Sequence, residues 1–413
     1  MFFLFIIYGA ISIYASRKLH NTFINPYTVL SAPYMFVVLL NKVWGEKIGF
    51  YPIGDMTLTV IGGGLICFFI GTLIASGRVS IILKNYVYPD NSQRLDNYRM
   101  KSMLYYSFVV TVISLLKALL IIRSMGFSGL TREGTLVAGL VGHLLLTAYP
   151  LQPFMFYYWL KNKKKVIYLI SFLLFLVVLF CSFVKYHIIG MIVICYLFVV
   201  LTERKYLKKG AILLVALVVT LFILNYIVDF VSNNVYSRVQ SSFYFNHFWK
   251  YLTGAVINGD RYYTGSIGGV AGIGYKLMTF LMALPNMFIF ALTGKKVFPY
   301  ESIRMTRVSY VGEYSNVIDA ISYMYSSETG IIGVIGFGLF FVLFGIAMEL
   351  LFLKNIFRVQ NLQIFISTVV TFFLFFSFFG TFYINSMPWE IAIYSALIPQ
   401  LFNNRAKIRF RLG

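Results

Sequence analysis

The sequence is poor in acidic residues, in charge of either sign and in cysteine. Its 413 residues include only 14 Asp and Glu, and charged residues make up 12% of the chain, against about 25% in an ordinary soluble domain. A water-soluble globule of this length needs far more charge to cover its surface. The three cysteines, Cys67, Cys181 and Cys195, lie within apolar runs and indicate neither a disulfide framework nor a cysteine-type zinc site. These absences argue against a soluble enzyme and a disulfide-stapled scaffold.

Familiar catalytic motifs are missing as well. The chain has no Walker A loop, no His-Glu-x-x-His, no Gly-x-Ser-x-Gly and no Asp-x-Asp pair. Its four histidines, His20, His143, His187 and His247, are scattered along the sequence. We therefore expect chemistry without a cofactor, a metal ion or a serine triad.

What the sequence does contain is apolar residues in long runs. They make up 59% of the chain, and aromatic residues alone make up 19%. A membrane-spanning helix needs about 20 apolar residues, and eleven segments approach or reach that length. They are 2–15, 24–41, 56–76, 103–122, 136–160, 166–184, 188–202, 210–228, 329–348, 362–384 and 389–404. The predicted fold is an all-α polytopic membrane protein with about 11 (10–12) transmembrane helices.

The basic residues orient these spans. Alternate loops, counted back from the C-terminal tail, hold 21 of the 35 Lys and Arg, whereas the short loops on the other side hold five. Basic loops stay in the cytoplasm, so we expect the N-terminus outside and the C-terminus inside. The net charge of +21 is thereby explained without a nucleic-acid partner.

One outer connection is far longer than the others. We divide the chain into a bundle of about eight spans (1–228), a long extracytoplasmic loop (229–328), and the last spans with a basic tail (329–413). The loop holds eight Lys and Arg, against the positive-inside trend. Within it, 277–293 is uncharged and contains Pro285. A full crossing there would move about half of the inner basic residues outside, so we expect an interfacial or re-entrant helix, with a twelfth span as the alternative.

Arginines and aromatic rings occur together in this loop. The stretch 236–251 contains Arg238, Trp249, Lys250 and Tyr251. Guanidinium groups bind diphosphates in a bidentate manner, and flat rings stack on sugars. These residues therefore indicate a lipid-linked diphosphate sugar as ligand; the alternative is an interfacial aromatic belt with arginines on lipid headgroups.

A second set of polar residues follows toward the end of the loop. Arg304 and Arg307 share one face if this segment is helical. Glu313 and Glu328 are candidate general bases, although Glu328 also suits the N-terminus of the next helix. The further candidate ligand residues are Arg261, Tyr310 and Asn316 in the loop, with Lys185 and His187 in a tight outer hairpin.

The layout resembles the oligosaccharide repeat-unit polymerases of O-antigen and capsule assembly (Wzy-type), and more distantly the O-antigen ligases. Three stretches carry the resemblance: 25–28 with the glycines of 61–71, 236–259 in the long loop, and Ser315-Asn316 followed by 327–333. The ligase signature has His where this chain has Ser315, which favours a polymerase.

The resemblance implies metal-independent glycosyl transfer in the bacterial cytoplasmic membrane, on its outer face, by a GT-C-like helical fold. The donor would be the growing polymer on undecaprenyl diphosphate and the acceptor a fresh lipid-linked oligosaccharide repeat unit. A chain-length regulator and a flippase are the implied protein partners. Arg238, Arg304 and Arg307, with Arg261 or Lys250 in reserve, would stabilise the leaving diphosphate. Glu313 or Glu328 would deprotonate or orient the acceptor, and Trp249, Tyr251 and Tyr310 would position sugars.

Two other classes of function compete with this interpretation. A lipid-linked oligosaccharide flippase shares the substrate, but transporters place charge within spans and keep loops short, the reverse of this chain. A ligase-like transferase shares the expected topology. Both remain alternatives at the level of the sequence.

Overall fold

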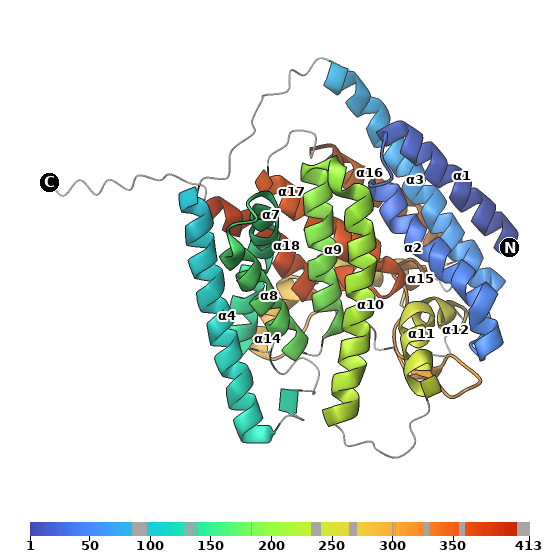
Figure 1. Ribbon diagram of the computed structural model, residues 1–413. Coiled ribbons are helices and arrows are strands. Elements are labelled where there is room, and N and C mark those ends of the chain that lie inside the picture. Colours follow the sequence, from blue (N-terminus) through green and yellow to red (C-terminus); the bar gives the residue numbers. More distant parts are fainter. Residues whose placement is uncertain are drawn as a thin grey trace. The chain divides into compact units, whose positions relative to one another are not determined.

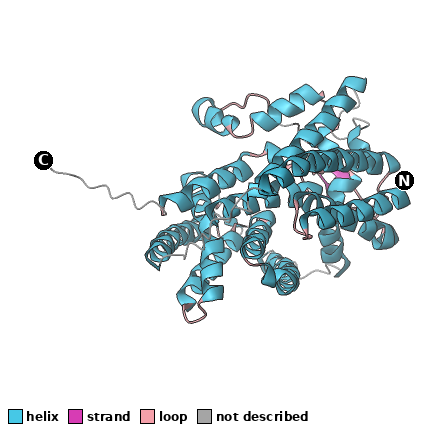
Figure 2. Ribbon diagram, turned by 90° about the horizontal axis from the view of Figure 1, so that it is seen from above, coloured by secondary structure: helices cyan, strands magenta, loops and turns pink. Residues whose placement is uncertain are grey.

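The described part of the chain is almost entirely helical (Figure 1). The computed structural model describes residues 1–84, 97–126, 129–130, 136, 139–182, 184–232, 241–263, 271–299, 301, 303–325, 330–354 and 360–402. Within these residues the only strands form one two-stranded sheet (Figure 2). The predicted all-α class is confirmed.

The chain folds into two compact units that alternate along the sequence. The first contains residues 1–89, 239–357 and 369–389, and the second contains residues 90–238, 358–368 and 390–413. The helices and strands of the first unit are α1 (Phe2–His20), α2 (Pro26–Leu40), η1 (Asn41–Gly45), η2 (Glu46–Ile48), α3 (Asp55–Lys84), α11 (Ser241–Ile257), α12 (Gly259–Tyr263), α13 (Ile273–Leu281), α14 (Pro285–Thr293), β1 (Thr306–Arg307), β2 (Tyr314–Ser315), α15 (Ala320–Met324), α16 (Gly330–Lys354), η6 (Val370–Leu374), η7 (Phe375–Phe378) and η8 (Phe382–Ile384). The second unit has α4 (Asn97–Met125), α6 (Gly139–Ala148), η3 (Tyr149–Leu151), α7 (Gln152–Lys161), α8 (Val166–Cys181), α9 (Lys185–Thr202), η4 (Arg204–Tyr206), α10 (Leu207–Ser232), and most of α17 (Gln360–Val369) and α18 (Ser386–Leu401).

Helices occupy each of the eleven segments predicted to span the membrane. In the described residues, six are long and apolar enough to cross a membrane: Phe2–His20, Pro26–Ile48, Asp55–Gly77, Arg99–Met125, Lys185–Thr202 and Gly330–Leu353. A bent pair raises the number to seven if it counts as one span, and Val166–Cys181 and Leu362–Phe378 are shorter apolar helices. The chain therefore has the composition of a multi-pass membrane protein.

Glycines bring α3 and α16 into close contact in the first unit. A Cβ atom on Gly71 would lie 2.1 Å from the carbonyl oxygen of Val342, and one on Gly345 would lie 2.3 Å from that of Phe68. Small residues at a helix interface let two backbones approach closely in lipid. The two glycine-rich runs of the sequence thus belong to neighbouring helices. These helices are parallel, because Gly338 lies beside Cys67, whereas Glu349, further along α16, accepts the hydroxyl of Ser76, further along α3.

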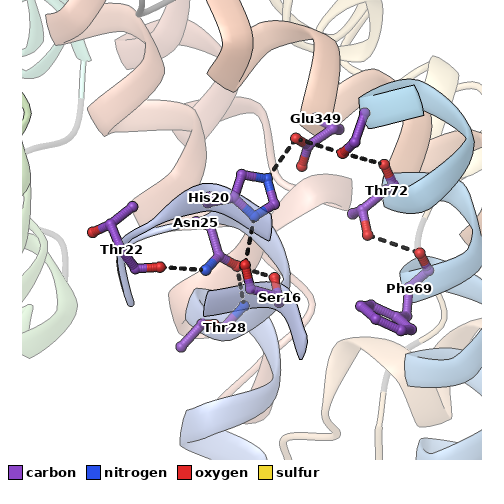
Figure 3. Close-up of polar contacts among 9 residues, drawn as sticks. Ser16, His20, Thr22, Asn25, Thr28, Phe69, Thr72 and Glu349 are labelled. Atoms are coloured by element: carbon purple, nitrogen blue, oxygen red, sulfur yellow. Dashed lines mark hydrogen bonds and ion pairs between the residues drawn. The ribbon is translucent and has the colours of Figure 1, made fainter. Parts of the chain in front are cut away.

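Polar residues fix the ends of α1, α2 and α16 (Figure 3). Asn25 caps α2: its side-chain oxygen accepts the N–H of Thr28 at 2.9 Å and the hydroxyl of Ser16 at 2.7 Å, and Pro26 supplies the preset first helical residue. His20 at the end of α1 bonds the Ser16 carbonyl at 2.8 Å and Glu349 of α16 at 2.6 Å. Short polar side chains therefore hold three apolar helices in register.

The uncharged stretch around Pro285 forms two helices rather than one. α13 and α14 meet at an angle of 78°, and Pro285 is the first residue of α14, where its missing N–H costs no hydrogen bond. Together the two helices have the shape of a broken span or a re-entrant loop, and not of a straight crossing.

Candidate functional site: an arginine and tyrosine surface

A small sheet-like platform joins the α2–α3 connection to the long loop. The N–H of Tyr51 donates to the carbonyl of Val308 at 3.0 Å, and the N–H of Tyr310 donates to that of Gly49 at 2.7 Å. Beside this bridge, β1 pairs with β2 in the antiparallel sense. The condition under which Arg304 and Arg307 would share a helix face is not met, because Arg307 lies in β1 and Arg304 precedes it in irregular chain.

An apolar core lies under the platform and fixes its position. Phe50, Trp249, Ile257 and Val308 form a buried cluster, with each side chain at most 5% exposed. Burial of an aromatic side chain contributes on the order of 2–3 kcal/mol. Trp249, which the sequence predicted to position a sugar, is thus a core residue that connects α11 to the loop.

Two arginines meet above this core. The Arg261 guanidinium of α12 donates to the main-chain carbonyl of Arg307. Arg307 in turn bonds the carbonyl of Ser309 at 2.8 Å through Nε and that of Tyr310 through a terminal nitrogen. A guanidinium carries five N–H donors on three nitrogens, so these carbonyls orient Arg307 without using all of its donors. Its side chain is exposed.

Tyrosine rings surround the arginine pair. The Arg261 guanidinium lies 4.7 Å from the ring centroid of Tyr51, within the range of a cation–π contact. Tyr51 and Tyr310 meet edge to face at 4.5 Å, and Tyr310 is 66% exposed. We call Tyr51, Arg261, Arg307 and Tyr310 the arginine–tyrosine surface. It combines cations with a flat exposed ring.

An ion pair between α11 and the β1–β2 hairpin lies next to this surface. Nζ of Lys250 lies 3.1 Å from Oε2 of Glu313, and the side chains are 19% and 11% exposed. The Glu313 N–H donates to the Ser309 hydroxyl at 2.8 Å, and its carbonyl accepts the N–H of Val308 at 2.8 Å. Because Glu313 is held by Lys250 and by the turn, its geometry suits an orienting group better than a free base.

Hydrogen bonds and close packing hold α11, α12 and α3 next to this part of the structure. The Asn258 amide donates to the carbonyl of Val317 at 2.9 Å, and a Cβ on Gly254 would lie 3.2 Å from Ser315. Asp260 accepts the N–H and the hydroxyl of Thr57 at 2.8 and 2.5 Å, which places a carboxylate at the N-terminus of α3. The arginine–tyrosine surface therefore lies at one end of an apolar helix.

A buried lysine lies deeper in the same unit. Lys276 of α13 has no exposed surface and donates to the Tyr325 carbonyl at 2.6 Å. Its ammonium group lies 4.9 and 5.6 Å from the ring centroids of Tyr262 and Tyr323. The Tyr262 hydroxyl donates to Glu301 at 2.6 Å. This set joins the bent helix pair to the loop and offers no exposed group to a ligand.

A buried carboxyl caps the last short helix of the loop. Asp319 accepts the N–H groups of Ile321 and Ser322 at 3.1 and 2.9 Å and the Tyr34 hydroxyl at 3.0 Å. Burial raises the pKa of Asp319 to about 6, against the opposing effect of these hydrogen bonds. The group is fully buried, so we assign it a structural role.

Apart from the buried Trp249, the predicted site residues are distributed as follows. Arg261, Arg307, Tyr310, Lys250 and Glu313 are brought together, and Arg304 and Asn316 are exposed on the same loop. Tyr251 stacks on Phe379 with centroids 5.8 Å apart. Lys185 and His187 begin α9 in the second unit, where His187 is 2% exposed. Arg238 and Glu328 lie outside the described residues.

Sequence reasoning missed three residues of this region. Tyr51, Asp260 and Asp319 stand in unremarkable stretches, and only the fold places them against the loop. A weak signal existed for Asp319, since an isolated Asp just before a short helical run is a common capping residue. Asp260 lies within α12 and caps α3 instead. No local signal marks Tyr51.

In the described part of the chain, no group of three His, Cys, Asp or Glu side chains is arranged to hold a metal ion. Comparisons with protein families, with curated proteins and with solved structures found no match.

Proposed function

We propose that this protein is a membrane glycosyltransferase that joins lipid-diphosphate-linked oligosaccharides, as a polysaccharide polymerase does. The observation that carries the proposal is the arginine–tyrosine surface at the end of α3. A diphosphate leaving group needs neutralising charge as the anomeric bond breaks, and a sugar needs a flat apolar face. Arg307 and Tyr310 supply both from one hairpin.

The parallel packing of α3 and α16 supports the proposed topology of eleven spans. Parallel neighbours begin on the same side, so the chain between them crosses the membrane an odd number of times. Five predicted spans, from 103–122 to 210–228, lie between them. A crossing by 273–293 would make the number even, and we therefore assign α13 and α14 to a re-entrant or interfacial position on the outer side.

In this scheme each group of the surface has one task. Arg261 and Arg307 neutralise the leaving diphosphate, with the exposed Arg304 as a further contact. Tyr310 and Tyr51 hold the sugar next to it. The Lys250–Glu313 pair holds the hairpin and orients the acceptor hydroxyl.

The experiment is transfer by the purified protein in lipid nanodiscs. Synthetic undecaprenyl-diphosphate repeat units are supplied, and products are separated by length. Dimers and longer chains are expected. Transfer to a different lipid acceptor would identify a ligase instead, and movement across a vesicle membrane without new bonds would identify a flippase.

Variants test the assignment of the surface. Arg307→Ala should lower transfer by about 10²–10³-fold, and Arg307→Lys should restore only part, because an ammonium group cannot bind in a bidentate manner. Lys295→Ala, an exposed cation of the same loop, is the matched control and should leave transfer within about threefold. Equal products from wild type and Arg307→Ala would overturn the assignment.

A further inference from the structure

Four helix ends with many lysines meet within the second unit. α7 and α9 end there, and α8 and α10 begin there. The two short connections between these helices, residues 161–165 and 203–209, hold eight Lys and Arg and one acidic residue, Glu203. The two connections therefore carry a large excess of positive charge at one end of four apolar helices.

Glu203 holds the two connections together. Its carboxylate pairs with Lys161 at the end of α7, lies 2.9 Å from Nζ of Lys205 and accepts the Tyr157 hydroxyl at 2.6 Å. Burial favours the protonated form of Glu203, but the hydrogen bonds from Tyr157 and the two lysines lower its pKa to about 2. The ionised carboxylate thus draws lysines of both connections together and neutralises only one of their charges.

Aromatic rings hold lysine side chains of this group close to the helix ends. Nζ of Lys163 lies 3.6 Å from the ring centroid of Trp159, within the range of a cation–π contact. Nζ of Lys165 donates to the Tyr158 hydroxyl at 2.6 Å. Trp and Tyr are enriched at the boundary between membrane and water. Ammonium groups that rest on these rings therefore lie at the level of lipid headgroups.

Exposed aliphatic side chains follow the lysines on both of the helices that begin there. On α8, Val166 and Ile167 come directly after Lys165 and are 49% and 52% exposed. On α10, Ile212 comes three residues after the exposed Lys209 and is itself 73% exposed. A molecule that contacts both kinds of side chain must carry an anionic head on apolar chains. A phospholipid has this chemistry, whereas a nucleic acid or a soluble acidic peptide has no apolar chains.

We propose that the lysines of residues 161–165 and 205–209, which we call the lysine surface, bind the headgroups of anionic phospholipids, with the acyl chains on the exposed aliphatic residues of α8 and α10. Ammonium groups bind phosphate as point charges, and the exposed Lys164, Lys208 and Lys209 make these contacts. Glu203 sets the spacing between the two groups of lysines. Lipid binding at this surface does not depend on glycosyl transfer.

The test is native mass spectrometry of the purified full chain, titrated with phosphatidylglycerol or with phosphatidylcholine of the same acyl chains. Wild type should bind phosphatidylglycerol about tenfold more tightly, and the preference should weaken as the salt concentration rises. The triple variant Lys164→Gln/Lys208→Gln/Lys209→Gln should lose about tenfold in affinity for phosphatidylglycerol and keep its affinity for phosphatidylcholine. Equal affinity of wild type for the two lipids would overturn the proposal.

A matched control separates the lysine surface from total charge. Lys47, Lys295 and Lys296 are exposed lysines of the first unit, and their replacement by Gln changes the net charge by the same amount. This control should keep its affinity for phosphatidylglycerol within about twofold of wild type, since long-range charge is screened by salt. A loss as large as that of the first triple variant would overturn the proposal.

Fluorescence locates the bound lipid. Trp159 is one of four tryptophans, so the difference between wild type and Trp159→Phe gives its emission. In phosphatidylcholine nanodiscs, phosphatidylglycerol brominated near the headgroup end of its chains should quench this emission more strongly than brominated phosphatidylcholine at the same mole fraction. Equal quenching by the two lipids would contradict the assigned place.

Soluble anions complete the test. Free glycerol phosphate supplies the headgroup without chains, and polyglutamate represents an acidic protein partner. Neither should displace phosphatidylglycerol at an equal concentration of charge, because neither covers the aliphatic side chains of α8 and α10. Displacement by either one would assign the lysine surface to a soluble ligand and overturn the proposal.

Discussion

The carboxylate of Asp260 accepts hydrogen bonds from the main-chain N–H and the hydroxyl of Thr57, 203 residues earlier in the chain. Thr57 is the third residue of α3, and the residue before that helix, Gly54, has no side chain to cap it. Asp260 therefore does from a distant helix what an N-cap side chain does locally. Its negative charge also suits the helix dipole. This contact joins the long loop to the first apolar bundle.

Removal of this cap should destabilise the protein by a measurable amount. We expect Asp260→Ala to lower the free energy of unfolding by about 1–2 kcal/mol, measured by thermal or denaturant unfolding in detergent. Gly54→Ala should be more harmful, since its Cβ would lie 1.3 Å from Oδ2 of Asp260. In the Asp260→Ala background the same change at Gly54 should cost less. Additive effects would show that the two residues are not in contact.

The α3–α16 contact predicts opposite outcomes for glycines on one helix. Gly71→Ala should lower the free energy of unfolding by about 1–3 kcal/mol, because the new methyl group meets the Val342 carbonyl. Gly63→Ala is the matched control, since no atom lies within 4 Å of its Cβ position, and it should be neutral or stabilising by up to about 1 kcal/mol. Unfolding midpoints in the same detergent test the pair. Equal losses at both positions would contradict the packing.

The buried Asp319 should give the free energy of unfolding a pH dependence opposite in sign to that of a carboxyl whose pKa is lowered on folding. Its pKa is raised from 3.8 to about 6 by burial, so between about pH 4 and pH 6 the folded protein holds a proton that the unfolded chain has released. The contribution to the free energy of unfolding therefore falls as the pH rises through this window. The shift corresponds to on the order of 3 kcal/mol.

Asp319→Asn isolates that contribution. Asn also caps helices, so α15 should stay capped while the titration is lost. Unfolding of both proteins at pH 4, 5, 6 and 7 gives the difference between them. The free energy of unfolding of the wild type should fall relative to that of Asp319→Asn as the pH rises. A constant difference would exclude titration of Asp319 in that range.

The Lys250–Glu313 pair should be structural rather than a source of base catalysis. Lys250→Met and Glu313→Gln should each lower the free energy of unfolding, with a coupling of about 1–3 kcal/mol in the double-mutant cycle, because both groups are largely buried. We expect Glu313→Gln to raise KM for the acceptor and to leave the pH midpoint of turnover unchanged. A change in that midpoint would instead make Glu313 the proton acceptor.

Much of the architecture was predictable because it depends on local chemistry. Apolar runs of the length of a bilayer form helices in any fold, since their backbone groups must be satisfied internally. Pro285 predicted the break in 277–293, and the structure has a bend of 78° there. The glycine runs at 61–71 and 330–338 lie on α3 and α16, and small residues of this kind allow the close contact that these two helices make.

The candidate site was predictable only as a composition. Sequence singled out Arg261, Arg307 and Tyr310, but not their mutual contacts or Tyr51 beside them. The sequence also predicted that Trp249 positions a sugar, whereas the fold buries that ring in the core. Exposure of a side chain depends on what packs over it, and no local pattern contains that information.

The sequence by itself determined the class of molecule, its helices and the sidedness that its basic loops predict, because these follow from local hydropathy and charge. Tertiary structure decided which distant residues meet. Asp260 reaches Thr57, and Glu390 reaches His143 across 247 positions. Contacts of this kind form when packed helices bring remote chain segments within hydrogen-bond distance, and the free energy that selects them comes from burial over the whole unit. The arrangement that we propose for catalysis is of this second kind.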